Sequence, residues 1–394
     1  MNVGNVLMKF ERSLTMKRTI GIIGSAVAMA GIALGCSGNT HKKDSLEDYL
    51  VPERNVCSGK FSLKLTDSTV CEVPEKEYNM FTNIQAVGNE LYCFSMLDQL
   101  RLSVYDIASG AHTKSIVYDP NILRSREIVD YQVLSRDSIL LVTAPSGAIV
   151  LSDGEGNIRE RWTPELLGAE LTGGGCNADY MGDGKICLVM CPGGRYSIER
   201  QAPDAPRHWI YNLKTGMWDG EVAPLDGVLK YSEGVYYFDM MRPYHLVKDN
   251  RLYVTYMMDH SVYVYDLQTG KMLMEKDISP EDALELPEPV AQEVATYESL
   301  SEMRRTTAFY GPLCYHSENG LFSRRYFYPL EQRKKNGYSM EICIYDDNFD
   351  LVGSAKIRTG VELPFATPDG FVATASNDTD ADNVTFLRYK IVPA

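Results

Sequence analysis

The chain has 394 residues, of which 44% are hydrophobic, and a formal net charge of −14 at pH 7. Proteins that bind nucleic acid or anionic lipid headgroups gain affinity by exchanging counterions for lysine and arginine. A chain this acidic is not expected to bind either without a local basic patch. Nucleic acid is therefore not an expected partner.

Residues 1–35 have the pattern of a secretory signal. Two basic residues, Lys17 and Arg18, precede the apolar run 20–34, and Gly35 and Cys36 follow it. Residues 32–36 resemble a bacterial lipoprotein signal, in which the cysteine is lipidated and becomes the first mature residue, although Leu34 stands at −2 rather than −3. We predict a signal peptide at 1–35, with 1–15 a candidate start-site extension, and lipidation at Cys36. The alternative is a transmembrane anchor, but the apolar run is shorter than the roughly 20 residues that span a bilayer.

The segment after the signal predicts the location of the protein. Residues 36–56 comprise the lipidated cysteine and a polar, charged tether, and residues 57–394 form one β-propeller domain. We expect a lipid-anchored protein of the cell envelope, in the outer membrane, whose membrane partner is reached through the anchor. The sequence does not distinguish the periplasmic from the surface side.

Six copies of one β-rich pattern follow the tether. Each copy has a polar turn, a β-rich run, a second turn and a second β-rich run, which in four copies contains Ile/Val-Tyr-Asp/Asn. The first runs cover residues 91–95, 139–143, 186–190, 252–256, 321–328 and 371–375. Several second runs lead into turns with glycine, which supplies the positive φ of a tight hairpin. Such repeats bury their faces against their neighbours.

The spacing of the copies predicts a six-bladed β-propeller of four-stranded blades, an all-β fold. Successive copies lie roughly 50 to 70 residues apart, and a blade needs roughly 40 to 50, so the longer intervals contain insertions. The sixth copy reaches Ala394 after its third strand. An N-terminal strand, 61–65 or 69–73, is therefore expected to close the last blade. The alternatives are a ring of seven or eight blades or another all-β repeat.

The insertions fall on one rim of the predicted ring. Connections between strands 2 and 3 of a blade, and from strand 4 to the next blade, emerge on the same side. The long ones are 192–207, 224–241, 279–305 and 329–336, and loops of such length are commonly functional. Residues 280–305 predict a helical insertion, interrupted at Pro287 and Pro289. It either caps a ligand site or is a solvated helix.

Arginines and tyrosines gather near these insertions in the fourth and fifth copies. The candidate ligand-binding residues are Arg242, Tyr244, His245, Arg304, Arg305, Tyr310, Arg324 and Arg325. Arginine binds carboxylates with paired hydrogen bonds, and tyrosine rings stack on sugars and peptides. The alternative is that the arginines pair with surplus acidic residues and the tyrosines pack within strands.

Motifs for catalysis or metal binding are missing from the sequence. There is no Gly-x-Ser-x-Gly elbow, phosphate-binding glycine loop or histidine cluster with metal-site spacing. Residues 378–383 resemble a calcium loop without its glycine and final glutamate. Most of the eight cysteines after Cys36 fall in predicted strands as buried thiols, and Cys57 with Cys71 is the most plausible disulfide. We predict no catalytic residue, metal ligand or cofactor.

The lipobox-like cysteine, the acidic tether and the Tyr-Asp-x-x-Thr/Ser-Gly turns together resemble TolB-like six-bladed propeller lipoproteins of Bacteroidetes, a family largely without assigned function. The resemblance implies the fold and an envelope location and transfers no catalytic residue. We expect a non-enzymatic binding or scaffold module that holds a peptide, a glycan or a partner protein on the insertion-rich rim. The alternative is a propeller hydrolase or lyase with a central metal held by inward carboxylates and amides.

Overall fold

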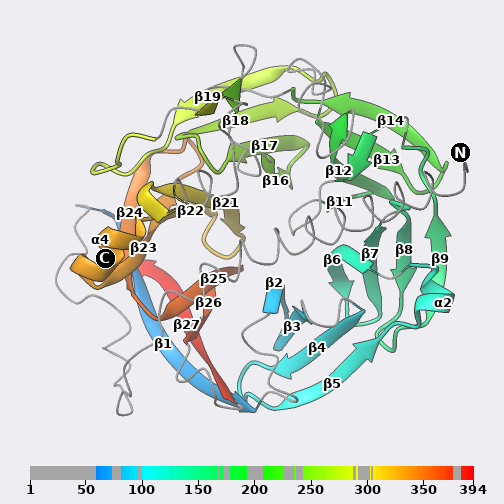
Figure 1. Cartoon of the computed structure of the whole chain (residues 1–394), viewed down its shortest axis with the longest axis horizontal. Coiled ribbons are helices and arrows are strands. Elements are labelled where there is room, and N and C mark those ends of the chain that lie inside the picture. Colours follow the sequence, from blue (N-terminus) through cyan, green and yellow to red (C-terminus); the bar gives the residue numbers. More distant parts are fainter. Residues whose placement is uncertain are drawn as a thin grey trace, which may run out of the picture. The chain divides into compact units, whose positions relative to one another are not determined.

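In the computed structural model the strands form a ring of β-sheets, viewed down its axis in Figure 1. The structure describes residues 59–72, 81–95, 100–125, 127–144, 146–166, 169–171, 178–192, 207–224, 235–236, 243–286, 290–291, 302, 305–375 and 383–394. They belong to one compact unit of the chain, His41–Ala394. Within these ranges no helix has both the length and the apolar character needed to cross a membrane.

Six blades of antiparallel strands follow one another in chain order, which confirms the predicted fold. Blades 1 to 3 contain β2 (Phe81–Val87), β3 (Glu90–Ser95), β4 (Arg101–Asp106) and β5 (His112–Val117); β6 (Glu127–Ser135), β7 (Ser138–Ala144), β8 (Ile149–Ser152) and β9 (Ile158–Trp162); and β11 (Ala178–Gly182), β12 (Lys185–Pro192), β13 (His208–Asn212) and β14 (Met217–Val222). Blades 4 to 6 contain β16 (Pro243–Lys248), β17 (Arg251–Tyr256), β18 (Ser261–Asp266) and β19 (Met272–Asp277); β21 (Phe309–His316), β22 (Leu321–Phe327), β23 (Tyr338–Tyr345) and β24 (Leu351–Arg358); and β25 (Val361–Thr367), β26 (Gly370–Ala375) and β27 (Asn383–Pro393).

The N-terminal strand closes the ring, as predicted. Strand β1 (Phe61–Glu72) is the outer strand of blade 6 and pairs antiparallel with β27, from Phe61 opposite Pro393 to Glu72 opposite Asn383. The two candidate segments belong to this one strand, interrupted by an irregularity after Leu65. A Cβ atom on Gly353 of β24 would lie 2.1 Å from the carbonyl oxygen of Phe61. Glycine therefore lets β1 pack closely against blade 5.

The repeated Asp/Asn-x-x-Thr/Ser-Gly turns have one shared geometry. In blade 1, the amide of Gly110 donates to the carbonyl oxygen of Asp106 at 2.8 Å, and the Asp106 carboxylate accepts from the Ser109 amide at 2.7 Å. The equivalent residues of blade 4 repeat both bonds at the same distances. Gly110 has a φ of 71°, which favours glycine. The motif thus fixes the hairpin between the third and fourth strands.

The core lies between neighbouring blades, because the middle strands are buried on both faces. Every residue of β22 and of β23 is buried, whereas the outer strand β19 alternates between exposed and partly buried residues. The predicted thiols Cys93, Cys187 and Cys343 are buried in this core as free cysteines. Packing between blades, rather than within one sheet, therefore supplies the apolar burial that stabilises the ring.

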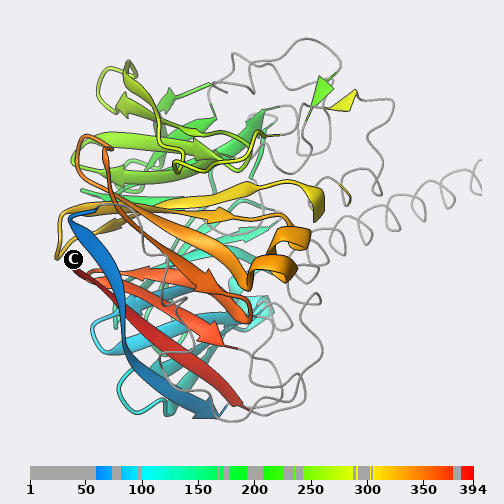
Figure 2. The ribbon, with the colours of Figure 1, turned by 90° about the vertical axis from the view of Figure 1, so that its left-hand side faces the viewer.

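The two rims of the ring differ. We call the rim with the connections between second and third strands and between blades the insertion rim, and the opposite one the hairpin rim. The insertion rim carries β10 (Ala169–Leu171), paired with the end of β12, the helix α4 (Leu330–Asn336), and a two-stranded sheet of β15 (Val235–Tyr236) and β20 (Val290–Ala291). A short helix, α2 (Pro120–Leu123), joins blades 1 and 2. Figure 2 shows β15, β20 and α4 on one side of the ring.

The predicted helical insertion at 280–305 lies largely outside the described residues. Its described parts are a turn with irregular chain at 280–286, the strand β20 at 290–291, and helical residues at 302, 305 and 306. Of the expected helix over 291–304, residue 302 is helical, whereas the first residue, Ala291, lies in a strand. The pairing of Val235 with Ala291 and of Tyr236 with Val290 explains it, because main-chain bonds to the preceding insertion favour extended backbone there.

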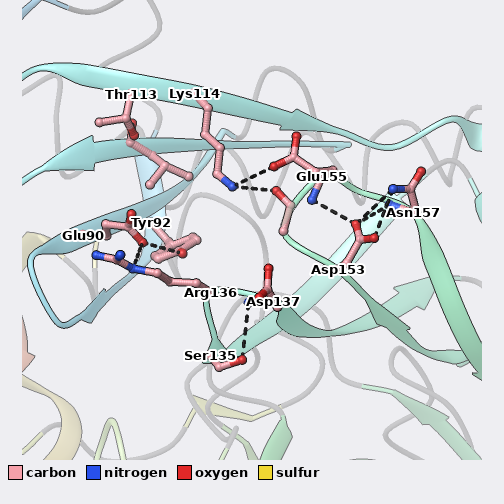
Figure 3. A network of polar contacts seen from close by, with 12 residues as sticks. Glu90, Tyr92, Thr113, Lys114, Ser135, Arg136, Asp137, Asp153, Glu155 and Asn157 are labelled. Atoms are coloured by element: carbon pink, nitrogen blue, oxygen red, sulfur yellow. Dashed lines mark hydrogen bonds and ion pairs between the residues drawn. The ribbon is translucent and has the colours of Figure 1, made fainter.

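On the hairpin rim, polar contacts join blades 1 and 2 (Figure 3). Arg136, in the turn between β6 and β7, lies 3.1 Å from the carboxylate of Glu90, which also accepts from the Tyr92 hydroxyl at 2.9 Å. Lys114 of β5 donates to the carbonyl oxygen of Gly154 at 2.7 Å. The side chains that make these contacts are exposed or partly exposed, and they link blade 1 to blade 2 on the rim opposite the insertions.

Candidate functional site

The structure distributes the predicted ligand-binding residues over separate places. Tyr244 and His245 lie on β16, Tyr310 on β21, and Arg324 and Arg325 on β22, while Arg305 precedes β21. Cys36, Arg242 and Arg304 lie outside the described residues, as do Cys57 and residues 378–382.

Arg324 is buried between blades 4 and 5, with 1% of its surface exposed. Its guanidinium donates to three main-chain carbonyl oxygens, at 2.6 Å to Tyr256, 3.3 Å to His260 and 3.4 Å to Gly311. The same group lies 4.0 Å from the centre of the Tyr310 ring. Burial lowers the pKa of the guanidinium. These contacts give Arg324 a structural role in joining the two blades, which neither sequence interpretation anticipated.

Two tyrosines of the predicted set, Tyr310 and the partly buried Tyr244, interact with Arg324. The Tyr310 hydroxyl lies 2.6 Å from Nδ1 of His260, and its pKa is raised by burial. Tyr244 interacts electrostatically with Arg324, and this interaction raises the pKa of the guanidinium against the larger effect of burial. The structure therefore places Tyr310 against Arg324 in the interior between blades, and Tyr244 of β16 interacts electrostatically with the same guanidinium.

Arg305 and Arg325 do not share the contacts described for Arg324. Arg305 is exposed and forms ion pairs with Glu302 at 2.7 Å and with Glu331 of α4 at 3.7 Å. This is the pairing with surplus acidic residues that the sequence left open as an alternative. Arg325 is 9% exposed, and a Cβ atom on Gly311 would lie 2.8 Å from its Nε. The glycine makes room for the guanidinium to pack against β21.

His245 belongs to a second polar group, the seam cluster, which consists of Asp179, His208 and His245 between blades 3 and 4. Nε2 of His245 lies 3.5 Å from Oδ2 of Asp179, and the two imidazole rings have centres 5.2 Å apart. His208 is fully buried, and its ring nitrogens make no hydrogen bond of ordinary geometry to the described residues, although the main chain of Ala223 interacts with the ring and raises its pKa. Buried polar atoms of this kind are uncommon in folded proteins.

Burial sets the protonation of the seam cluster. It lowers the pKa of His245 and, more strongly, that of His208, and it raises the pKa of Asp179. Both imidazoles are therefore held neutral near pH 7, each with one nitrogen able to donate and one able to accept. The Asp179 side chain is 26% exposed, so the cluster has an opening to solvent.

The chain places the seam cluster at the insertion rim. His208 is the first residue of β13, directly after the insertion at 192–207, and His245 is the third residue of β16, four positions after the end of the insertion at 224–241. Asp179 is the second residue of β11. Of these three residues, the sequence analysis placed only His245 among the candidate ligand-binding residues, because it looked for arginines and tyrosines in the fourth and fifth copies, whereas Asp179 and His208 lie in the third.

A repeated position would have revealed Asp179. Gln85, Gln132 and Asp179 stand opposite the third residue of the paired strand, at the same register in blades 1 to 3. Each side chain accepts a hydrogen bond from a main-chain amide of the next inner strand, at 2.9 Å from Val133, 2.6 Å from Tyr180 and 3.0 Å from Val247. Glutamine occupies this position in two of the three blades, so a comparison of Asp, Glu and Asn across the copies does not reveal it.

These inter-blade bonds bear on the predicted alternative of a central metal. The three inward polar side chains already accept from main-chain amides, which engages oxygen atoms that a metal would need. Among the described residues, no group of three or more His, Cys, Asp and Glu side chains is arranged to hold a metal ion.

A serine–histidine pair lies between blades 5 and 6. Nε2 of His316 is 2.7 Å from the Ser323 hydroxyl, and Nδ1 is 2.8 Å from the carbonyl oxygen of Thr367. His316 is fully buried and Ser323 is 1% exposed. A nucleophile must reach its substrate, so this pair is a structural contact between blades rather than a catalytic one.

Comparison with known proteins identifies the fold. No family model and no curated protein matches the chain. A crystal structure of a DUF4221 family member from Bacteroides vulgatus is similar over 86% of this chain and 100% of its own, with a TM-score of 0.62 and 14% identity. A candidate exported protein of Bacteroides fragilis covers 83% of this chain and 95% of its own, with a TM-score of 0.50 and 12% identity. BamB from Moraxella catarrhalis covers 83% and 100%, with a TM-score of 0.40 and 10% identity. The chain thus has a six-bladed β-propeller fold.

Proposed function

We propose that the protein is a lipid-anchored module of the cell envelope that binds a peptide, a glycan or a partner protein on its insertion rim without chemically changing it. The observation that carries this proposal is the concentration of insertions on one rim of the ring, with the buried imidazoles of His208 and His245 beside two of them. Propeller proteins keep their blades regular for packing, so irregular additions on one face are typical of binding surfaces.

The insertions on this rim are organised around blade 4. The strands β15 and β20 come from the insertions before and after blade 4 and pair with each other. His208 and His245 of the seam cluster lie on the strands that follow the insertions at 192–207 and 224–241. A ligand with both donor and acceptor groups would satisfy the neutral imidazoles of His208 and His245.

The envelope location is supported by the N-terminal sequence. The apolar run before Gly35 and Cys36 is typical of export and lipidation, and one protein of similar fold is a candidate exported protein. Anchoring at Cys36 and residence in the outer membrane are parts of the proposal, and the membrane side is left open.

Binding can be tested on arrays of oligosaccharides and of peptides with the purified mature chain. We expect at least one bound class, with affinity lost in the His208→Ala/His245→Ala variant and kept in Arg136→Ala, the matched change on the hairpin rim. Folding of both variants is checked by their melting transitions. Binding that the hairpin-rim change abolishes and the seam change spares would contradict the proposed site. Conversion of the bound compound into a product would contradict the non-enzymatic role.

A further inference from the structure

One segment of the insertion rim lies on blade 5 without belonging to its sheet. We call residues 280–286 the strap; they follow blade 4 and contain one turn, closed by the Ala283 amide on the Pro280 carbonyl oxygen at 3.0 Å. The amide of Leu284 donates to the Tyr326 hydroxyl at 2.8 Å. Oδ2 of Asp282 lies 3.1 Å from Nζ of Lys356 on β24. The strap is thus held by side chains rather than by a strand ladder.

The surface beneath the strap is aromatic. Four tyrosines, which we call the tyrosine cluster, have ring centres 5.1, 5.0 and 4.7 Å apart in succession and are at most 8% exposed: Tyr310, Tyr326, Tyr328 and Tyr338. Ala283, Leu284 and Leu286 of the strap pack against them. Tyr310 lies on β21, Tyr326 on β22, Tyr328 directly after β22 and Tyr338 at the start of β23, all at the insertion-rim end of blade 5.

A cation is fixed at the edge of this surface. Nζ of Lys356 lies 5.1 Å from the centre of the Tyr338 ring and 5.6 Å from that of Tyr328, distances at which a cation is attracted to a ring face. It also lies 3.8 Å from the carboxylate of Glu341, which accepts from the Tyr328 hydroxyl at 2.5 Å. Its side chain is 15% exposed, whereas that of Asp282 is 59% exposed. The cation belongs to blade 5, and its acidic partner in the strap lies at the surface.

We infer that the tyrosine cluster and Lys356 form a binding site for a short acidic–aliphatic peptide, which the strap occupies in this structure. The strap contacts the site as a peptide ligand would: a carboxylate on Lys356, a main-chain amide on a tyrosine hydroxyl, and aliphatic side chains on the rings. This inference rests on the proposed function and names its ligand class at blade 5.

The spacing of these contacts defines the ligand. Asp282 supplies the carboxylate, and Leu284, two residues later, supplies both the amide donor and an aliphatic side chain. The site should therefore take a peptide with Asp-x-Leu or a close equivalent, with a turn at the aspartate. Because the strap is covalently attached, its effective concentration at the site is high, and a free peptide competes poorly until the strap is weakened.

A fluorescein-labelled peptide with the sequence of residues 279–286 provides the probe. Its binding is measured by anisotropy to the wild-type chain, to Asp282→Ser/Leu284→Ser, and to that variant with Lys356→Met. We expect the strap variant to bind at least about tenfold more tightly than wild type, and Lys356→Met to remove that gain, since tenfold corresponds to one lost contact of ordinary strength. A peptide with asparagine in place of its central aspartate is the matched control and should bind weakly.

A second measurement uses the wild-type chain and does not depend on the folding of variants. Excess peptide should accelerate hydrogen exchange at the Leu284 amide, because displacement of the strap breaks its bond to Tyr326. A strap variant with a native melting transition that binds no better than wild type, together with unchanged exchange at Leu284, would overturn the inference. Ligands found on the arrays that depend on the seam cluster would still support the proposed function in that case.

Discussion

Replacing Arg324 with methionine keeps most of the side chain's length and removes its guanidinium. The bond to the Tyr256 carbonyl oxygen, at 2.6 Å, is of the kind that contributes about 1.5–3 kcal/mol when the donor is charged. The contact with the Tyr310 ring adds about 0.5–2 kcal/mol. The two longer bonds add less, and relief from burying a cation offsets part of the loss. We expect the free energy of unfolding to fall by about 3 kcal/mol.

The change can be measured by thermal and urea unfolding at pH 7.5. At about 2 °C or slightly more per kcal/mol for a large domain, the melting temperature should fall by roughly 5–10 °C. Arg324→Lys should lie between methionine and wild type, because a lysine ammonium cannot reproduce the planar set of donors. Arg305→Ala, which removes an exposed ion-paired arginine from the same predicted set, should have the same melting temperature as wild type. An Arg324→Met variant that melts with wild type but loses affinity for a carboxylate ligand would refute the structural role.

Three further predictions concern the anchor, the closure and the pH dependence. Cys36→Ser should release the protein from the membrane fraction or leave an uncleaved precursor, and unchanged lipid labelling would contradict lipidation. Deleting residues 37–74 removes β1 and should sharply lower the melting temperature, while deleting 37–50 should not. Gly353→Ala should lower the free energy of unfolding by about 1–3 kcal/mol through overpacking. Gly220→Ala is its control, because a Cβ atom there has no neighbouring atom within 4 Å. Burial lowers the pKa of His208, His245 and His316 in the folded chain. Below about pH 6.5 the unfolded chain therefore binds more protons than the folded chain. The free energy of unfolding should decrease as the pH is lowered, by up to about 1.4 kcal/mol per pH unit for each histidine. Equal unfolding free energies at pH 7.5 and 5.5 would contradict this.

The architecture was readable because its signals are local. Asp106 and Gly110 lie within one hairpin, and the bonds that fix it join residues next to each other in the sequence. The missing outer strand could be inferred because a blade with three strands leaves an open edge. The blades could therefore be predicted from the turn motifs and from the number of strands in each copy.

The candidate site was less predictable because its contacts are distant in sequence. Nothing near Arg324 indicates that its partners are carbonyl oxygens of Tyr256, His260 and Gly311, since every residue carries such an oxygen. The same holds for His208 and His245, which meet only when blades 3 and 4 pack together. Composition drew attention to Tyr310 and Arg324, but it could not distinguish a buried contact between blades from a surface for ligands.

The pairing of the first strand with the last also constrains how the chain can be made. Phe61 pairs with Pro393, so β1 leaves the ribosome long before its partner β27 has been synthesised. During that interval β1 is an unpaired strand, the kind of segment that promotes misassembly until it is covered. Pairing of such distant segments is also slow. The ring can therefore close only after the last strand, β27, has been synthesised. A product truncated before Asn383 would lack this strand, and its ring would remain open even if its other blades had folded.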